Sequence, residues 1–186
     1  MAQQEHDGAM WVFGYGSLVW NPEFPVAERI VARLDAYARS FCMSSIHHRG
    51  TPEMPGLVLA LDERDGATCT GLALRVEPGH EDPTLAMLRE RELVSSAYLE
   101  RRLPLDLADG RRIEAVAYVI DQAHEQYMQE LDLEAQARII AAATGGRGPN
   151  DEYLHNTTAH LTHLGIADPD LDWLSTRVRK LRQQQE

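Results

Sequence analysis

Residues 12–19, Val-Phe-Gly-Tyr-Gly-Ser-Leu-Val, join an apolar run to a turn built from glycine, tyrosine and serine. Glycine has no side chain, so the backbone at Gly14 and Gly16 could approach a bound molecule closely. Successive backbone N–H groups in such a turn form a concave site for an anion. The same residues also suit a tight bend at the end of a strand, and composition alone does not separate the two interpretations.

A second candidate lies in residues 89–98, Arg-Glu-Arg-Glu-Leu-Val-Ser-Ser-Ala-Tyr, which we predict to be helical. Glu92 shares a helical stripe with Leu85 and Leu88 and is followed by small serines. Burial there would raise the proton affinity of its carboxylate and suit it to general acid–base chemistry. Glu90 also has apolar neighbours at helical spacing, and both glutamates could instead pair with a neighbouring arginine. Spacing leaves these alternatives open.

Other catalytic signatures are incomplete. A dinucleotide fingerprint would need glycine at Val19, Ser17 is not in a G-x-S-x-G turn, and a zinc-protease helix would need histidine at Met128. His160 and His163 are three residues apart but have no carboxylate or cysteine at ligand spacing. We therefore expect no metal site, and we expect the histidines at the surface or at the edge of the core.

Composition removes further classes. Of 18 basic residues only Lys180 is a lysine, so Schiff-base catalysis and a P-loop are excluded. A net charge of −11 gives no electrostatic footprint for nucleic acid or an anionic membrane. No apolar run reaches the ~18 residues of a membrane span, and the N-terminus is too polar for a signal peptide. Cys42 and Cys69 then suggest reduced thiols and a cytoplasmic location.

The elements that must position these residues follow from periodicity and turn residues. Alternating or apolar runs predict strands, with hairpin turns at 63–66 and 109–110, over residues 11–18, 29–41, 57–61, 68–76, 103–107 and 112–120. A helix should begin at Pro83 and end before Pro104, and another should span 131–143. Asn150 should cap a third helix, and a last one should bury Leu171, Leu174, Val178 and Leu181.

Strands early in the chain and helices late predict an α+β protein with a mixed or antiparallel β-barrel-like sheet and flanking helices. A chain of 186 residues with 44% hydrophobic residues suits a single core. We expect one domain over residues 10–182, a flexible arm over 1–9 and a polar tail over 183–186.

Four segments in this order resemble the ChaC-type γ-glutamylcyclotransferases, in particular the glutathione-specific branch. They are Trp11–Trp20, His48-Arg49-Gly50 with Met54-Pro55-Gly56, Arg91-Glu92 with Tyr98, and Gly148-x-Asn150-x-x-Tyr153-Leu154. The resemblance runs from about residue 10 to about residue 174. Members of the family often carry two glycines just before the tyrosine, where this chain has Ser96-Ala97.

The resemblance implies a compact mixed barrel, no cofactor, and cleavage of glutathione to 5-oxoproline and cysteinylglycine. It implies that Glu92, rather than Glu90, is the acid–base residue. The substrate-binding residues that we carry over or expect beside it are Gly14, Tyr15, Gly16, Ser17, Leu18, Val19, Arg49, Tyr98 and Tyr153. For the three tyrosines a place in the core is an equal alternative, and Ser17 is expected to orient the loop rather than to attack.

These residue types fit that reaction. The substrate's own α-amine attacks its side-chain amide, and well-oriented cyclisations reach effective molarities of about 10⁵ M or more, so no protein nucleophile is needed. A carboxylate can take a proton from the ammonium and return it to the departing amine. The substrate is anionic, so backbone N–H groups, or arginines such as Arg49 and Arg91, must attract it locally. A cyclotransferase for another γ-glutamyl amide or dipeptide, and a non-catalytic γ-glutamyl-binding protein, remain alternatives.

Overall fold

The computed structural model describes residues 8–129 and 131–184, and two compact units can be separated among them. Unit 1 contains residues 8–40 and 60–124, and unit 2 contains residues 41–59 and 125–184. Most of the expected N-terminal arm, residues 1–7, and the last two residues of the expected tail lie outside the described residues. The single domain over 10–182 stays a prediction.

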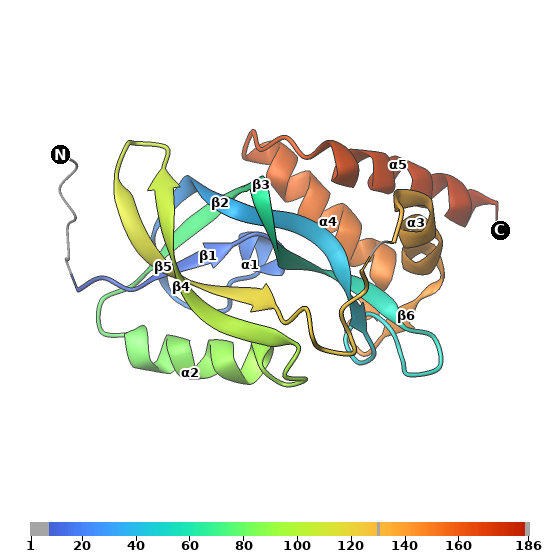
Figure 1. The fold of residues 1–186 in the computed structure, drawn as a ribbon, viewed down its shortest axis with the longest axis horizontal. Helices are drawn as coiled ribbons and strands as arrows, with labels where there is room; N and C mark the ends of the chain where they lie inside the picture. The colour runs from blue at the N-terminus through green and yellow to red at the C-terminus, as the bar shows by residue number, and fades with distance from the viewer. Residues whose placement is uncertain (1–7, 130, 185–186) are drawn as a thin grey trace. The chain divides into compact units, whose positions relative to one another are not determined.

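Five strands form a closed barrel in the order β1-β3-β2-β4-β5, with a further pairing between β3 and β5 (Figure 1). The strands are β1 (Trp11–Gly14), β2 (Val26–Ser45), β3 (Gly56–Val76), β4 (Tyr98–Leu107) and β5 (Arg112–Ile120). β1 runs antiparallel to β3 and parallel to β5, while β4 and β5 form an antiparallel hairpin. The barrel is therefore mixed, which confirms the predicted fold class.

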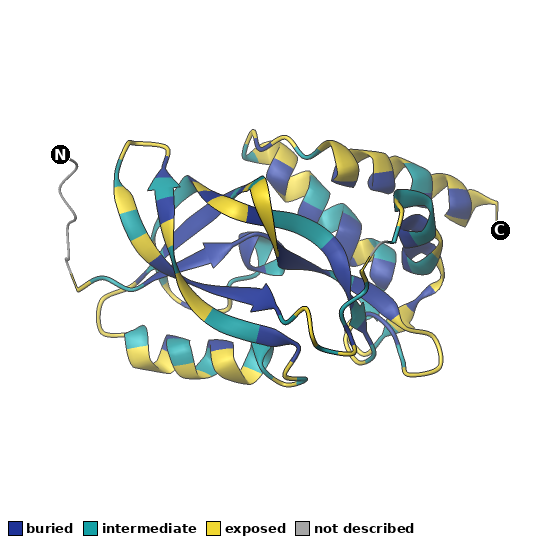
Figure 2. Ribbon diagram, viewed as in Figure 1, coloured by how far each residue is buried: buried dark blue, intermediate teal, exposed yellow. Residues whose placement is uncertain are grey.

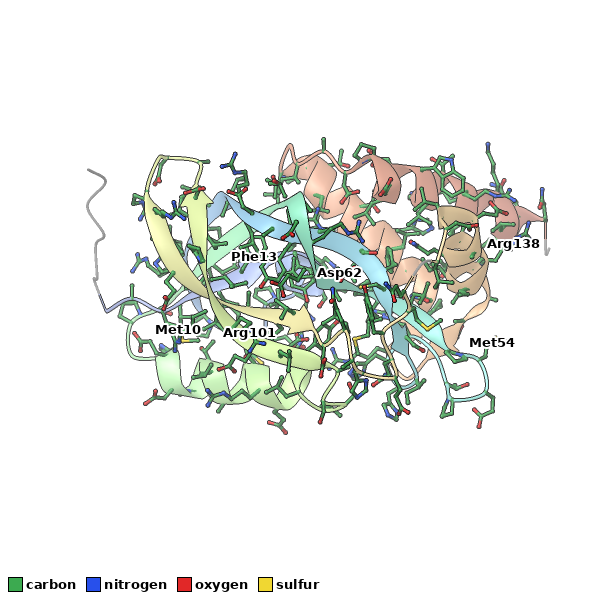
Figure 3. All side chains as sticks on the ribbon, in the orientation of Figure 1. Met10, Phe13, Met54, Asp62, Arg101 and Arg138 are labelled. Carbon is green, nitrogen blue, oxygen red and sulfur yellow. The ribbon has the colours of Figure 1, made fainter. Side chains whose placement is uncertain are left out.

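In unit 1 the apolar runs that predict strands form buried strands of the barrel. β1 is buried along its whole length, and it is paired with β3 on one side and with β5 on the other (Figure 2). Phe13, marked in Figure 3, is 1% exposed inside this sheet. The turn between β4 and β5 contains Gly110 at φ +92°, a conformation that suits glycine, as the Asp-Gly signal predicted.

Three local expectations, at α1 (Ser17–Trp20), within β3 and at the start of α2 (Glu81–Glu92), are wrong. The first strand ends at Gly14, and Ser17–Trp20 form a short helix, α1, closed by a 3.0 Å bond from the Val19 N–H to the Gly16 carbonyl. The hairpin at 63–66 is absent, because β3 continues through Gly66, whose φ of +77° is accommodated inside the strand. Pro83 is the third residue of helix α2, where a missing N–H costs nothing because the first four have no helical partner.

Helix α2 spans Glu81–Glu92, so the predicted helix over 89–98 stops at Glu92 and Tyr98 begins β4. A turn separates the two elements, with the Ser96 N–H bonded to the Leu93 carbonyl at 3.3 Å. Ser96 has a φ of +58°, which ends any helical continuation. Glu92 is thereby the last residue of its helix.

Unit 2 contains the predicted C-terminal helices and the ends of β2 and β3 that fall within 41–59. Its elements are α3 (Leu133–Ala142), β6 (Thr144–Gly145), β7 (Gly148–Pro149), α4 (Asn150–His163) and α5 (Pro169–Gln183). Leu154 on α4 is buried, and so is the apolar stripe of α5, Leu171, Leu174, Val178 and Leu181, as predicted. Met54, in the loop before β3, is exposed (Figure 3). Among the described residues, no helix combines the length and apolar character that a membrane span requires.

The prediction that Asn150 caps α4 is wrong. The capping position is Pro149, and no side chain caps this end. Asn150 is the first helical residue, and its amide forms two hydrogen bonds with the backbone of Leu57. The Asn150 side chain therefore joins α4 to Leu57 of β3 and does not cap the helix.

Candidate functional site

The glycine-containing segment of unit 1 is held from both sides. Its turn folds back onto β1, since a Cβ placed on Gly14 would lie 3.4 Å from the Leu18 side chain. The buried Tyr15 hydroxyl donates to the Tyr118 carbonyl at 2.9 Å, and Arg39 Nε donates to the Tyr15 carbonyl at 2.7 Å. These contacts fix the path of the backbone from Gly14 to Val19 without a bound molecule.

The side chains of residues 17–19 are buried to different degrees. Leu18 and Val19 are core residues, whereas Ser17 is half-buried. The Val19 N–H is bonded within the turn to the Gly16 carbonyl, so it is occupied by the protein itself. The side chains of Leu18 and Val19 can then contribute to binding only through the shape that they give the turn.

Glu92 is the better protected of the two candidate glutamates. Its side chain is 16% exposed, whereas Glu90 is an exposed residue of the same helix. Glu92 Oε1 lies 3.3 Å from Arg91 Nε, so the ion pair expected as an alternative to catalysis does form. Partial burial and a charged partner therefore coexist at this carboxylate.

Arg91 brings the two sequence motifs together. Its guanidinium donates to Ser17 Oγ at 2.7 Å and to the Asn21 carbonyl and Glu23 Oε2, both at 2.9 Å. Its side chain is only 8% exposed. One buried guanidinium thus contacts both the glycine-containing segment and Glu92.

A second charged cluster near Glu92 was not anticipated from the sequence. The buried Tyr118 hydroxyl donates to Glu100 Oε2 at 3.1 Å, and Arg89 donates to both oxygens of Glu100 at 2.9 Å. Burial raises the pKa of Tyr118, and the negative charges of Glu100 and Glu92 raise it further. Hydrogen bonds from Arg89 hold the pKa of Glu100 below its ordinary value.

This cluster depends on strand register, because Glu100 of β4 pairs with Tyr118 of β5. A single residue of slippage would move both side chains to the other face. No local pattern in the sequence reports that pairing. Tyr98 lies on the same hairpin, opposite Ile120, and is buried.

Unit 2 contains the remaining predicted site residues, Arg49 and Tyr153. The Arg49 guanidinium lies over the Tyr153 ring, 5.7 Å from its centre, and donates to the Pro149 carbonyl at 3.0 Å. The Tyr153 hydroxyl accepts a hydrogen bond from the Leu59 N–H at 3.3 Å. Arg49 is 6% exposed. Its contacts with Pro149 and Tyr153 join the loop after β2 to the start of α4.

Two glycines of unit 2, Gly56 of the second motif and Gly145 before the fourth, serve the same packing. A Cβ on Gly56 would lie 2.2 Å from the Arg49 carbonyl oxygen, and one on Gly145 would lie 2.4 Å from the Gly50 nitrogen. Backbones at these distances leave no room for a side chain. The structure thus joins residues 14–19 to Glu92 through Arg91 in unit 1, and Arg49 to Tyr153 in unit 2. Tyr98 also lies in unit 1, opposite Ile120.

Known proteins resemble this chain over most of its length. Residues 10–181 match the family described as ChaC-like protein. The glutathione-specific gamma-glutamylcyclotransferase of Escherichia coli (strain K12) is 36% identical, over 97% of this chain and 78% of its own length. The enzyme of the same name from Schizosaccharomyces pombe is 31% identical, over 95% of this chain and 96% of its own length.

Solved structures share the fold. A selenomethionine-labelled gamma-glutamyl cyclotransferase specific to glutathione from yeast superposes with a TM-score of 0.85 at 23% identity, covering 95% of this chain and 98% of its own. A gamma-glutamyl cyclotransferase superposes with a TM-score of 0.57 at 16% identity, covering 89% of this chain and 86% of its own. At these identities the structural likeness carries the fold alone.

Proposed function

Because the chain belongs to the ChaC-like protein family, we propose that it is a γ-glutamylcyclotransferase that cleaves glutathione to 5-oxoproline and cysteinylglycine. The observation that carries the proposal is the placement of Glu92. It is a partly buried carboxylate at the end of α2, joined through Arg91 to the glycine-containing segment. Relatives from bacteria, yeasts and animals that are named for this reaction support it.

In the proposed mechanism Glu92 takes a proton from the α-ammonium of the γ-glutamyl group. The neutral amine then attacks the γ-carbonyl carbon, forming the ring C–N bond of 5-oxoproline as the amide C–N bond to cysteine breaks. The protonated Glu92 gives its proton to the departing nitrogen. The ring nitrogen then passes its second proton through the same carboxylate to the released amine, so cysteinylglycine leaves as an ammonium, the ring holds a neutral amide and Glu92 ends ionised. General acid–base catalysis of this kind contributes typically about 10²–10⁴-fold.

The remaining proposed roles concern binding. Backbone N–H groups in residues 14–18 would face the attacked carbonyl oxygen or the α-carboxylate, where one donor is worth roughly 3 kcal/mol. Ser17 Oγ accepts a hydrogen bond from Arg91, which supports an orienting role rather than nucleophilic attack. We keep Arg49, Tyr98 and Tyr153 as proposed contributors to the binding site. No metal or cofactor has a part in these steps.

The cellular location, the type of partner and the extent of the domain are also proposals. Cys42 and Cys69 are buried and are not joined in a disulfide, which supports a reducing, cytoplasmic environment. The net charge of −11 supports a small-molecule substrate rather than nucleic acid or a membrane as partner. We retain the proposal that residues 10–182 act as one domain.

Incubation of the purified chain with glutathione, followed by mass detection of 5-oxoproline, tests the function. Glu92→Gln keeps the shape of the side chain but cannot carry the proton, and we expect kcat to fall by about 100-fold or more. Glu90→Gln is the matched control on the exposed face and should retain kcat within about threefold. A Glu92→Gln enzyme of near wild-type rate would contradict the mechanism.

Two further outcomes separate the alternatives. Faster turnover of γ-glutamyl-alanine than of glutathione would reassign the substrate. Calorimetric binding of glutathione without product formation would instead indicate a γ-glutamyl-binding protein.

A further inference from the structure

Arg91 contacts groups from three separate places in unit 1. Ser17 follows the glycine-containing turn, Asn21 and Glu23 follow α1, and Glu92 ends α2. Glu23 adopts a φ of +62°, an uncommon conformation for a residue other than glycine. The segment after α1 therefore takes an unfavourable backbone conformation at the residue whose carboxylate meets the guanidinium.

We propose that Arg91 is a positioning residue that fixes the distance between Glu92 and the glycine-containing segment. This inference rests on the proposed function, in which Glu92 moves the proton and the segment holds the γ-glutamyl group. Charge-assisted hydrogen bonds at 2.7–2.9 Å are the strong class, and Arg91 makes three of them. Loss of these bonds would let α2 and the segment move independently.

The shape of the guanidinium explains why lysine cannot replace it. Nη2 faces Ser17, Nη1 faces Asn21 and Glu23, and Nε faces Glu92, so the rigid fork serves several directions at once. The ammonium of a lysine is a single point with a shorter reach. Arg91→Lys should therefore keep the positive charge but lose the simultaneous contacts.

The contact between Arg91 and Glu92 also affects how readily the Glu92 carboxylate takes up a proton. Arg91 forms ion pairs with both Glu92 and Glu23, and the Glu92 charge also acts on Tyr118, which is hydrogen-bonded to Glu100, the partner of Arg89. Arg91 is the cation in direct contact with the Glu92 carboxylate. Its removal takes away the positive charge that favours the ionised carboxylate, so the pKa of Glu92 should rise relative to the wild type.

The kinetic experiment compares Arg91→Met, Arg91→Lys and Arg75→Met with the wild type, with glutathione as substrate. Methionine keeps most of the apolar stem, and Arg75 is the control because it also forms an ion pair in unit 1, with Glu28, outside the charged groups near Glu92. We expect both Arg91 variants to lose at least about 10-fold in kcat with KM changed less than about threefold, because misplacement by 1 Å can cost about 100-fold. Arg75→Met should keep kcat within about threefold.

A purely structural role would give a different result. It would lower the melting temperature of the Arg91 variants while the folded fraction kept its kcat, and that result would overturn the proposal. An Arg91→Lys enzyme with wild-type kcat would overturn it too, because charge alone would then suffice.

A readout that needs no turnover keeps the inference apart from the proposed function. Carbon-detected NMR titration of the Glu92 carboxyl group should give a higher midpoint in Arg91→Met than in the wild type, with Glu92→Gln identifying the signal. An unchanged midpoint would overturn the contact between Arg91 and Glu92. A shifted midpoint in an enzyme that releases no 5-oxoproline would uphold that contact, refute the proposed function and refute the catalytic positioning with it.

Discussion

Replacement of Asn150 is the sharpest test of how unit 2 is held together. Asn150 is 0% exposed, and its Oδ1 accepts from the Leu57 N–H at 2.8 Å while its Nδ2 donates to the Leu57 carbonyl at 2.8 Å. Asn150→Ala leaves one buried donor and one buried acceptor without these partners. Each such group costs about 1–3 kcal/mol, so the free energy of unfolding should fall by about 2–6 kcal/mol.

Asn150→Asp separates this role from helix capping. Aspartate caps helices about as well as asparagine, so a capping role predicts little change in stability. In the structure an aspartate could still accept from the Leu57 N–H, but an ionised carboxylate has no hydrogen to donate to the Leu57 carbonyl. It would also bury a charge, so Asn150→Asp should be at least as destabilising as Asn150→Ala at pH 7.

Urea denaturation followed by circular dichroism measures these changes. The midpoint should fall while the slope stays the same, because the surface exposed on unfolding is unchanged. Asn156→Ala is the control on the same helix, at a half-buried position, and should stay within about 0.5 kcal/mol of the wild type. A loss below about 1 kcal/mol in Asn150→Ala, or a neutral Asn150→Asp, would refute the reasoning.

Two further substitutions test local strain and burial. Ser96 holds a φ of +58°, so Ser96→Gly should relieve strain and raise the melting temperature by about 1–3 °C, whereas Ser95→Gly should not; equal effects in a thermal scan would contradict this. Burial, with a further contribution from Arg179, lowers the pKa of His155. The unfolded chain then binds more protons near its pKa of about 6.5, so stability should decline as pH falls from 7 to 5.5. His155→Gln should flatten that decline, and parallel stability curves would refute the assignment.

The fold class was predictable because its signals are local. Apolar runs and the Asp-Gly pair at 109–110 lie within single elements, and the observed barrel and hairpin follow them. The same Asp-Gly signal misled at 65–66, where β3 continues without reversing. A glycine at positive φ is required by a turn and tolerated in a long strand, and only the pairing of distant strands separates the two cases.

The candidate site was predictable in part. A helical stripe placed Glu92 among apolar neighbours, but spacing could not separate it from Glu90. In the structure the two glutamates differ because α2 ends at Glu92 and a turn at Ser96 follows. Glu92 is therefore at the end of the helix, whereas Glu90 lies on its exposed face. The contacts of Tyr118 with Glu100 depend on register between β4 and β5, which no residue pattern specified.

The scarcity of lysine takes on a structural meaning once the guanidiniums are placed. Arg91 meets the carboxylates of Glu23 and Glu92, and Arg49 is shared between Tyr153, the Pro149 carbonyl and, at 3.5 Å, Glu152. A cation already balanced by carboxylates attracts an anion weakly, because the neighbouring charges cancel at the distance from which a substrate approaches. We therefore expect the backbone N–H groups of residues 14–18, rather than Arg91, to attract the carboxylates of glutathione. The arginines instead use several donors each to join segments that are distant in sequence, which one lysine ammonium could not do.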